Sequence, residues 1–179
     1  KAASPMSDPF AVSAMELLAR WLPVAYAEPE NMDARGACLI GSAQAAVAFN
    51  SANLGLAHAI SGALGALNHV PHGLANALAL PWTMAFNQPA LGDKGDLVAK
   101  LYDGNTAAEG LSKLRKAIGL DVSLDGHVNS DSERDLVAEG ASKSGQIRVN
   151  PRTPSVPEIR AILEAMRQPT NGEQPRLDV

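Results

Sequence analysis

The segment LGLAHAISGALGALNHVPHGLANALALPWTMAFN, from Leu54 to Asn87, decides the fold of this chain. Its first part, about residues 53–67, is expected to be a helix rich in Ala and Gly, whose small side chains let a neighbouring backbone approach closely. Pro71 then stands at a first-turn position and is expected to start a second helix that runs to about Asn87. This second helix is apolar nearly all round, which is typical of a central, buried helix. Pro81 inside it predicts a bend or a break.

Two histidines divide this segment, His58 on the first helix and His72 at the start of the second. Neutral imidazole is a common ligand for borderline metals such as zinc and ferrous iron. The two rings meet only if the chain reverses between them. Asn68 to Pro71 supplies the reversal, because Pro71 lacks an N–H and Val70 before it is biased away from helix. The pair is a candidate metal site, and its alternative is two hydrogen-bonded structural histidines.

The sequence predicts helices in the rest of the chain as well. Further helices are expected over residues 8–25, 31–49, 93–102, 106–118, 131–143 and 156–167. Ser7 is expected to cap the first of these and Asn31 the second, while Pro23 ends or kinks the first. The tail from Gln168 onward holds Pro, Asn and Gly and is expected to be loose. We find no strand pattern and no G-x-G-x-x-G fingerprint, so the sequence predicts an all-α fold in a single domain, residues 1–179.

The composition narrows the class of protein. Hydrophobic residues make up 46% and aromatic residues only 4%, so the core must be built from aliphatic side chains, which suits close-packed helices. The net charge of −4 argues against a nucleic-acid partner or an anionic membrane surface. No signal peptide or membrane-length apolar run is present, so a soluble, cytoplasmic protein is expected. Cys38 is the only cysteine and is interpreted as a small buried apolar residue, in keeping with a reducing compartment.

The segment 54–87 resembles the signature of the iron-containing (group III) alcohol dehydrogenases, which reads G-L-x-H-A-x-[SA]-H-x-L-G-A-x-x-x-x-P-H-G-x-A-N-A and is followed by L-P-x-x-M-x-[FY]-N. The matching positions are Gly55–His58, Leu64–Ala66, Pro71–Gly73, Ala75–Ala77, Leu80–Pro81, Met84 and Phe86–Asn87. The similarity continues upstream over residues 33–50 and downstream over Asn150-Pro151-Arg152 and residues 156–166. It runs from about residue 7 to about residue 167 and concerns the C-terminal half of the family only.

The resemblance implies a fold and a metal. The fold is the helical bundle that forms the C-terminal domain of dehydroquinate-synthase-like and iron-containing alcohol dehydrogenases. The metal is Fe²⁺ or Zn²⁺, bound by His58 and His72, and an Asp and a third His on an earlier helix would complete the site before Lys1. The family's NAD(P) binds to an N-terminal α/β domain that this chain lacks. We therefore expect a chain that begins partway through a longer product, has no cofactor-binding residue of its own and is inactive alone.

The resemblance also implies a function, an NAD(P)-dependent interconversion of alcohols with aldehydes or ketones. Phe49 and Gly62 are the substrate-channel candidates; the family usually has a His at the position of Gly62, and its loss puts the usual proton path in doubt. No catalytic residue is assigned. The expected partner is a small alcohol or aldehyde, and a homo-oligomer is left open. The alternatives are a maleylacetate-reductase-like enzyme or a non-catalytic helical interaction module with a degenerate metal site. His69 is expected on a turn and His127 in solvent.

Overall fold

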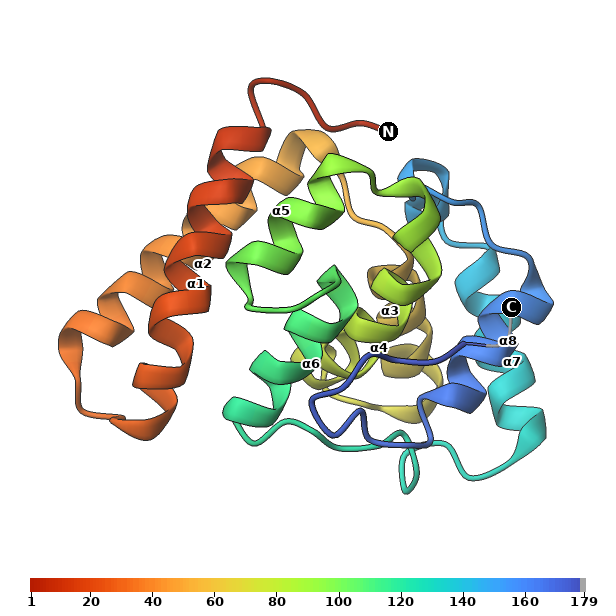
Figure 1. Ribbon diagram of the computed structural model, residues 1–179. Helices are drawn as coiled ribbons and strands as arrows, with labels where there is room; N and C mark the ends of the chain where they lie inside the picture. Colours follow the sequence, from red (N-terminus) through yellow and green to blue (C-terminus); the bar gives the residue numbers. More distant parts are fainter. Residues whose placement is uncertain (178–179) are drawn as a thin grey trace.

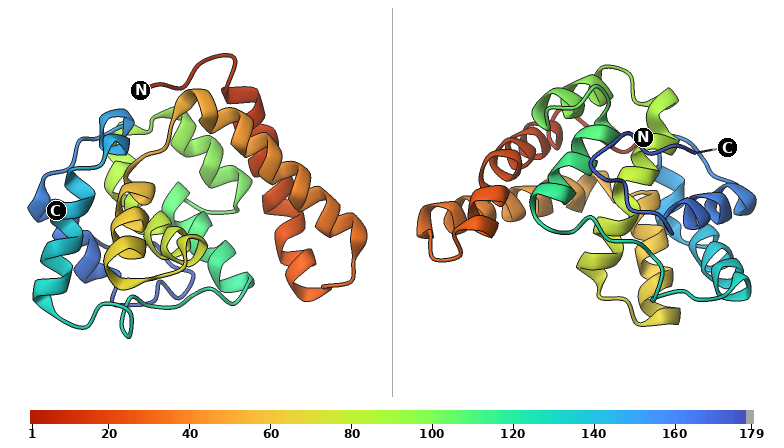
Figure 2. Two further views of the ribbon diagram at one scale, coloured as in Figure 1. Left: turned by 180° about the vertical axis from the view of Figure 1, so that it is seen from behind. Right: turned by 60° about the horizontal axis from the view of Figure 1, so that its bottom comes forward.

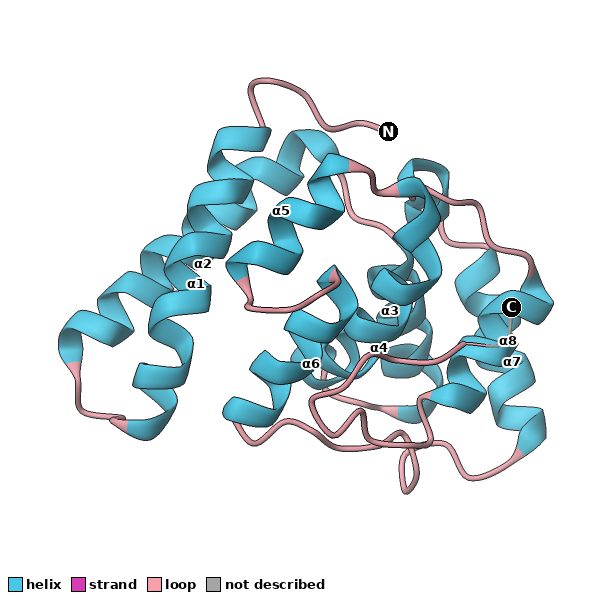
Figure 3. Cartoon of the chain, in the orientation of Figure 1, coloured by secondary structure: helices cyan, strands magenta, loops and turns pink. Residues whose placement is uncertain are grey.

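The computed structural model describes residues 1–177, and over that range the chain consists of helices and connecting loops without a strand (Figure 3). The α-helices are α1 (Asp8–Ala27), α2 (Met32–Ala52), α3 (Leu56–Asn68), α4 (His72–Asn87), α5 (Asp93–Leu101), α6 (Ala107–Ala117), α7 (Asp131–Ser142) and α8 (Val156–Ala165). Two short 3-10 helices, η1 (Gln88–Ala90) and η2 (Gly145–Val149), stand before α5 and α8. The all-α prediction is confirmed.

The helix ends differ from expectation at three places. Neither Pro23 nor Pro81 stops its helix: α1 continues to Ala27 and α4 to Asn87. Pro81 is buried, and the packing of α4 against α3, α6 and α8 outweighs the backbone hydrogen bond that a proline forfeits. Ser7 does not cap α1 through its side chain, because its Oγ accepts from the N–H of Ser4 and donates to the Ser4 carbonyl instead. Asn31 does cap α2, accepting from the N–H of Ala34 at 3.0 Å.

The helices α1 and α2 form an antiparallel hairpin that lies to one side of the other helices (Figures 1 and 2). It meets the rest of the described chain mainly where α1 touches α5 and α6. The outer face of α2 is apolar and exposed, with Met32, Leu39, Ile40, Val47 and Phe49 in solvent. Cys38 lines a hollow together with Met32 and Leu39. It is half-buried, so the prediction that it is a buried residue was wrong. Its partial burial raises the pKa of the thiol, which opposes a reactive thiolate.

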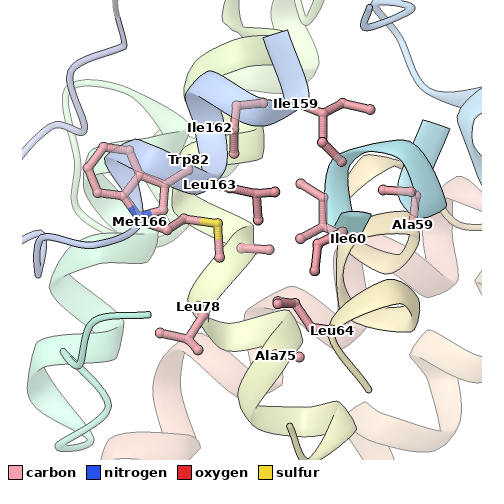
Figure 4. Close-up of a cluster of buried hydrophobic side chains, with 14 of the residues drawn as sticks. Ala59, Ile60, Leu64, Ala75, Leu78, Trp82, Ile159, Ile162, Leu163 and Met166 are labelled. Carbon is pink, nitrogen blue, oxygen red and sulfur yellow. The ribbon is translucent and has the colours of Figure 1, made fainter. Parts of the chain in front are cut away.

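The core lies on both sides of α4, which is the central helix as expected. Ile60 and Leu64 of α3 and Leu163 of α8 are fully buried around its residues Ala75 and Leu78 (Figure 4). Gly65 of α3 faces the turn that follows the helix, because a Cβ built on it would lie 3.6 Å from the carbonyl oxygen of Val70. None of the helices in the described part is long and apolar enough to span a bilayer.

The C-terminal tail is packed, which corrects the expectation of a loose end. Thr170 is buried, and both its N–H and its hydroxyl donate to a carboxylate oxygen of Asp121, at 3.0 and 2.9 Å. Further along, the tail bonds to α6: Lys116 donates to the carbonyl of Asn171. Figure 1 shows the tail passing across α4 and α6 on its way to the C-terminus. These bonds join residues far apart in sequence, so local composition did not predict them.

Ion pairs join α7 to α8 at the surface. Arg160 donates to Asp131, Asp135 and Glu164, at 2.5, 2.9 and 3.0 Å. Arg167 donates to Glu164 at 2.6 Å and to Asp125 at 3.0 Å. These hydrogen bonds, from Arg167 and then Arg160, hold the pKa of Glu164 below its ordinary value. A carboxyl whose pKa is depressed by folding stabilises the native state above its unfolded pKa and loses that effect as pH falls through the folded value.

We therefore expect Glu164→Gln to lower the thermal midpoint at neutral pH and to have no effect in acid. The gap between the parent and the variant should begin to close below the ordinary carboxyl pKa of about 4.3 and vanish once pH has fallen through the lower native value, where the parent carboxyl is itself protonated. Calorimetric melting curves between neutral and acidic pH measure it. Because Glu164 is exposed, the gap should also narrow in high salt. A gap that persists unchanged into acid would show that the ion pairs do not carry the effect.

Candidate metal site

The rings of His58 and His72 lie together in the fold. Their centroids are 5.3 Å apart and the ring planes are tilted by 60°. His58 is half-buried in the first turn of α3, and His72 is the exposed first residue of α4. The sequence therefore predicted correctly that the chain reverses and brings the two imidazoles close. Their use as metal ligands stays a prediction.

The reversal is built by the residues between the two helices. His69 closes α3 in the left-handed conformation, with φ of 55°, and its N–H bonds to the carbonyl of Leu64. Val70 is buried, and its N–H bonds to the same carbonyl at 3.4 Å. Pro71 is extended and donates no hydrogen bond, so α4 begins directly after it. His69 is thus an exposed turn residue, as expected, whereas His127, expected in solvent, lies half-buried in a loop before α7.

Asn76 completes the surroundings of His72, one helical turn further along α4. Its Nδ2 donates to the carbonyl of His72 at 3.0 Å and lies 3.1 Å from Nε2 of the same residue. The carbonyl oxygen of His72 can only accept a hydrogen bond, so the amide nitrogen of Asn76 must face it. Nε2 of His72 then also accepts a hydrogen bond from this nitrogen. The amide oxygen of Asn76 is buried without a hydrogen-bond partner. Sequence reasoning missed this residue, although a spacing of four on a helix signals such a contact.

The electrostatics favour a neutral ring at His58. Burial, and then the charge of His72, lower the pKa of His58. A neutral imidazole offers the lone pair that a metal needs. Among residues 1–177, no group of three or more His, Cys, Asp or Glu side chains could hold a metal ion. The described part of the chain therefore brings two imidazoles together and no further ligand of those types.

These residues fit a borderline divalent metal in part. Two imidazole nitrogens are the donors that Zn²⁺ and Fe²⁺ accept. The unpaired amide oxygen of Asn76 shows that the protein alone does not satisfy the polar groups beside His72. Nε2 of His72 contacts Asn76, so a metal at this nitrogen has to displace the amide N–H. Two ligands leave most of the coordination shell to other groups.

The two substrate-channel candidates lie on different helices. Gly62 is exposed on α3, one turn after His58, and a Cβ added to it would meet nothing within 4 Å. It lines a groove of about 320 Å³ with small residues of α3 and with Gly140 and Ser144. Phe49 is 43% exposed on α2 and does not line this groove. The structure thus gives Gly62 an open setting and does not bring Phe49 to it.

A further hollow of the described chain lies away from the two histidines. It has a volume of about 590 Å³ and is formed by the hairpin, between residues of α1 and α2 that include Leu22, Met32 and Leu39. Its lining includes Cys38, whose pKa is raised by burial, but no histidine or carboxylate, so it offers no pair of metal ligands. We therefore centre the candidate site on the two imidazoles, although they lie on an open surface.

The comparisons with known proteins point to one family. The model for the Fe-containing alcohol dehydrogenase family, C-terminal, matches residues 1–167. The 1,3-propanediol dehydrogenase of Klebsiella pneumoniae is 36% identical over 174 residues, covering 91% of this chain and 45% of that protein. The chain thus spans about half the length of the curated relatives it matches.

Solved structures agree with the sequence match. A 1,3-propanediol oxidoreductase is 34% identical with a TM-score of 0.87, covering 92% of this chain and 46% of that one. The maleylacetate reductase from Rhizobium sp. strain MTP-10005 is 26% identical with a TM-score of 0.84, covering 96% of this chain and 47% of that one. Membership of this family implies, in general, a metal and NAD(P). From the length of the match and the likeness of the fold, this chain belongs to the Fe-containing alcohol dehydrogenase family, to whose C-terminal part it corresponds.

Proposed function

We propose that His58 and His72 bind a divalent metal, Fe²⁺ or Zn²⁺, in an NAD(P)-dependent alcohol dehydrogenase of which this chain is the metal-binding part. The observation that carries the proposal is the convergence of the two rings, 5.3 Å apart, in a chain of this family. A divalent ion supplies Lewis acidity towards an alcohol or carbonyl oxygen, and the nicotinamide exchanges the hydride. The substrate is then a small alcohol, or the aldehyde or ketone made from it.

The residues of this chain have two tasks in that reaction. The first is to hold two imidazoles in one place, and the rings on α3 and α4, 5.3 Å apart, support this task. The second is to leave room for substrate beside them, and the open surface at Gly62 provides it. Gly62 has no group that moves a proton, so protons have to reach the substrate by another route. The nicotinamide contacts are assigned to other parts of the intact protein, because the described helices include no glycine-rich phosphate turn.

Two alternatives remain under test. The maleylacetate reductases share the fold almost as closely as the propanediol enzyme, with TM-scores of 0.84 and 0.87. The Pro71-His72-Gly73 motif favours the alcohol dehydrogenases over that branch. The observation that favours a non-catalytic helical module is Gly62, because it stands where the family usually has a His. The other properties proposed are a cytoplasmic location, no nucleic-acid partner, and a homo-oligomer as an open outcome.

We expect these 179 residues by themselves to give no NAD(P)-linked oxidation of short alcohols, whichever divalent metal is added. Joined to the N-terminal part of a propanediol dehydrogenase, they should support turnover, because the nicotinamide is then held beside the metal. The absorbance of NADH or NADPH is the measurement, with maleylacetate as the competing substrate. In the joined protein, His72→Ala should remove turnover, and the matched variant His127→Ala should keep it.

Two outcomes would contradict this proposal. Turnover by the 179-residue chain alone would require a nicotinamide site within helices to which we assign none. Preferential reduction of maleylacetate would favour the second enzyme class. Gly62→His, placed in the open space on α3, tests the proton path separately: if that position relays protons, the variant should change the pH dependence of turnover.

A further inference from the structure

Asn150 is a buried polar residue that ties three segments together. It is 2% exposed and stands directly after η2. Its Oδ1 accepts from the N–H of Leu56 at 3.0 Å and from Nδ2 of Asn87 at 3.2 Å. Its Nδ2 donates to Oδ1 of Asn87 at 2.7 Å and to the carbonyl of Arg152 at 2.6 Å. Together, these hydrogen bonds from one buried amide join the first residue of α3, the last residue of α4 and the loop before α8.

The amide of Asn150 occupies the space that a side chain at Gly55 would need. A Cβ built on Gly55 would lie 2.7 Å from Oδ1 of Asn150, closer than real Cβ atoms come to a neighbour. The backbone conformation of Gly55 is in the ordinary extended region, with φ of −121°, so space and not torsion excludes a side chain. The missing side chain therefore admits Asn150 to the start of α3. A side chain at position 55 would therefore force either the amide of Asn150 or the start of α3 to move.

Arg152 adds further contacts between the same segments. It donates to the carbonyl of Phe86 at 3.2 Å, and its guanidinium lies over the ring of that residue, 4.1 Å from the centroid. It also pairs with Glu158 in the first turn of α8, at 2.6 Å. We call residues 150–152 the clamp. It fixes the beginning of α3 to the end of α4 and both to the beginning of α8.

We infer that the clamp is a positioning device for the metal site, with Asn150 as the residue that sets the place of His58 relative to His72. The inference rests on the proposed function of the two histidines. Leu56, which Asn150 holds, is two residues before His58, so a shift of this turn moves the imidazole with it. His72 is exposed and His58 is only half-buried, so the packing around the two rings does little to correct such a shift. Metal ligands need placement to within about 0.5 Å, and their supporting groups supply it.

Positioning and stability lead to different expectations for Asn150. A buried amide with several partners also stabilises the fold, since each broken bond would leave an unpaired group. Loss of stability alone, however, does not move the two rings apart in the molecules that remain folded. A positioning residue predicts that ring separation and metal affinity change at temperatures where the variant is fully native.

The first experiment needs no metal. Nuclear Overhauser effects between the ring protons of His58 and His72 are expected in the parent, because the centroids are 5.3 Å apart. These signals should vanish or weaken strongly in Asn150→Ala and in Gly55→Ala, which adds one methyl group and removes no polar atom. Ile162→Val is the matched control, because it weakens the core of α8 without touching the clamp. It should keep the signals.

The second experiment measures Zn²⁺ affinity by calorimetry on the same proteins, all below their melting temperatures. Asn150→Ala and Gly55→Ala should bind at least about tenfold more weakly than the parent, the size of effect that supporting residues have at metal sites. Ile162→Val should bind with nearly the affinity of the parent. Should Asn150→Ala not fold, Gly55→Ala and Asn87→Ala carry the test, because each disturbs one side of the same amide.

The outcomes distinguish the two proposals. Overhauser signals that survive between the rings in both clamp variants overturn the positioning role, whatever the metal does. A second outcome is that the signals vanish in these variants while the parent protein binds no metal. That outcome supports the clamp and contradicts the proposed function. Equal weakening of Zn²⁺ binding by Ile162→Val would show that stability alone is responsible and would overturn the positioning role.

Discussion

His58→Ala and His72→Ala should each abolish the binding of Zn²⁺ and Fe²⁺ by this chain. Within the described residues, these imidazoles are the site's only histidines, and no carboxylate or thiolate joins them in a metal-binding group. A single remaining imidazole holds a hydrated ion weakly. The affinity should therefore fall by more than the roughly 10–100-fold that the loss of an outer-shell partner costs.

The chain provides matched controls for this experiment. His69 and His127 are the other two histidines, and neither lies in the ring pair. Their alanine variants remove an imidazole from the protein but should leave the affinity unchanged. Titration calorimetry at neutral pH measures all four variants. Unchanged affinity in His58→Ala and His72→Ala would mean that both rings are structural.

Phe86→Ala should be among the most destabilising single substitutions in the chain, at about 3–5 kcal/mol. Phe86 is 1% exposed on α4, and its removal leaves a cavity in the core and takes away the ring beneath Arg152. The free energy of unfolding of native domains is about 5–15 kcal/mol, so this loss would remove a large part of the stability. Urea unfolding followed by circular dichroism gives the number. Leu136→Ala, at a position 57% exposed on α7, is the control and should cost little.

A loss below about 1 kcal/mol for Phe86→Ala would contradict the assignment of this residue to the core. It would imply that neighbouring side chains close the space freely. The urea slope should stay near that of the parent, since it follows the surface exposed on unfolding and one side chain changes that surface little. A marked change in slope would mean that the variant no longer unfolds in a single step.

Local signals were sufficient to place most helices. Thr106, Ser130 and Ser155 each accept a hydrogen bond from the N–H of an acidic residue three positions later, which is the usual start of a helix. Apolar periodicity then gave the lengths of these helices to within a few residues. Pro81 does not break α4, because the effect of a proline depends on what packs around it. The packed tail was missed because its partners, such as Asp121, are distant in sequence.

The candidate site was predictable in its residues but not in its geometry. The motif around His58 and His72 indicated both ligands, and Pro71 indicated the reversal between them. The crossing of α3 over α4 sets the ring separation, and that crossing depends on packing against α7, α8 and the clamp. The role of Asn150 could not be read from its neighbours in sequence, because its amide bonds reach back to Asn87 and to Leu56.

The close approach of Gly55 and Asn150 has a consequence for anyone who builds variant libraries of this chain. The space that a side chain at position 55 would take is the space that the amide oxygen at position 150 occupies. Each residue therefore defines which types its partner admits, and the two positions form one epistatic unit. Randomised separately, both would be scored as intolerant. Randomised together, they sample smaller residues at 150 that leave room for a larger one at 55, combinations that no series of single substitutions reaches.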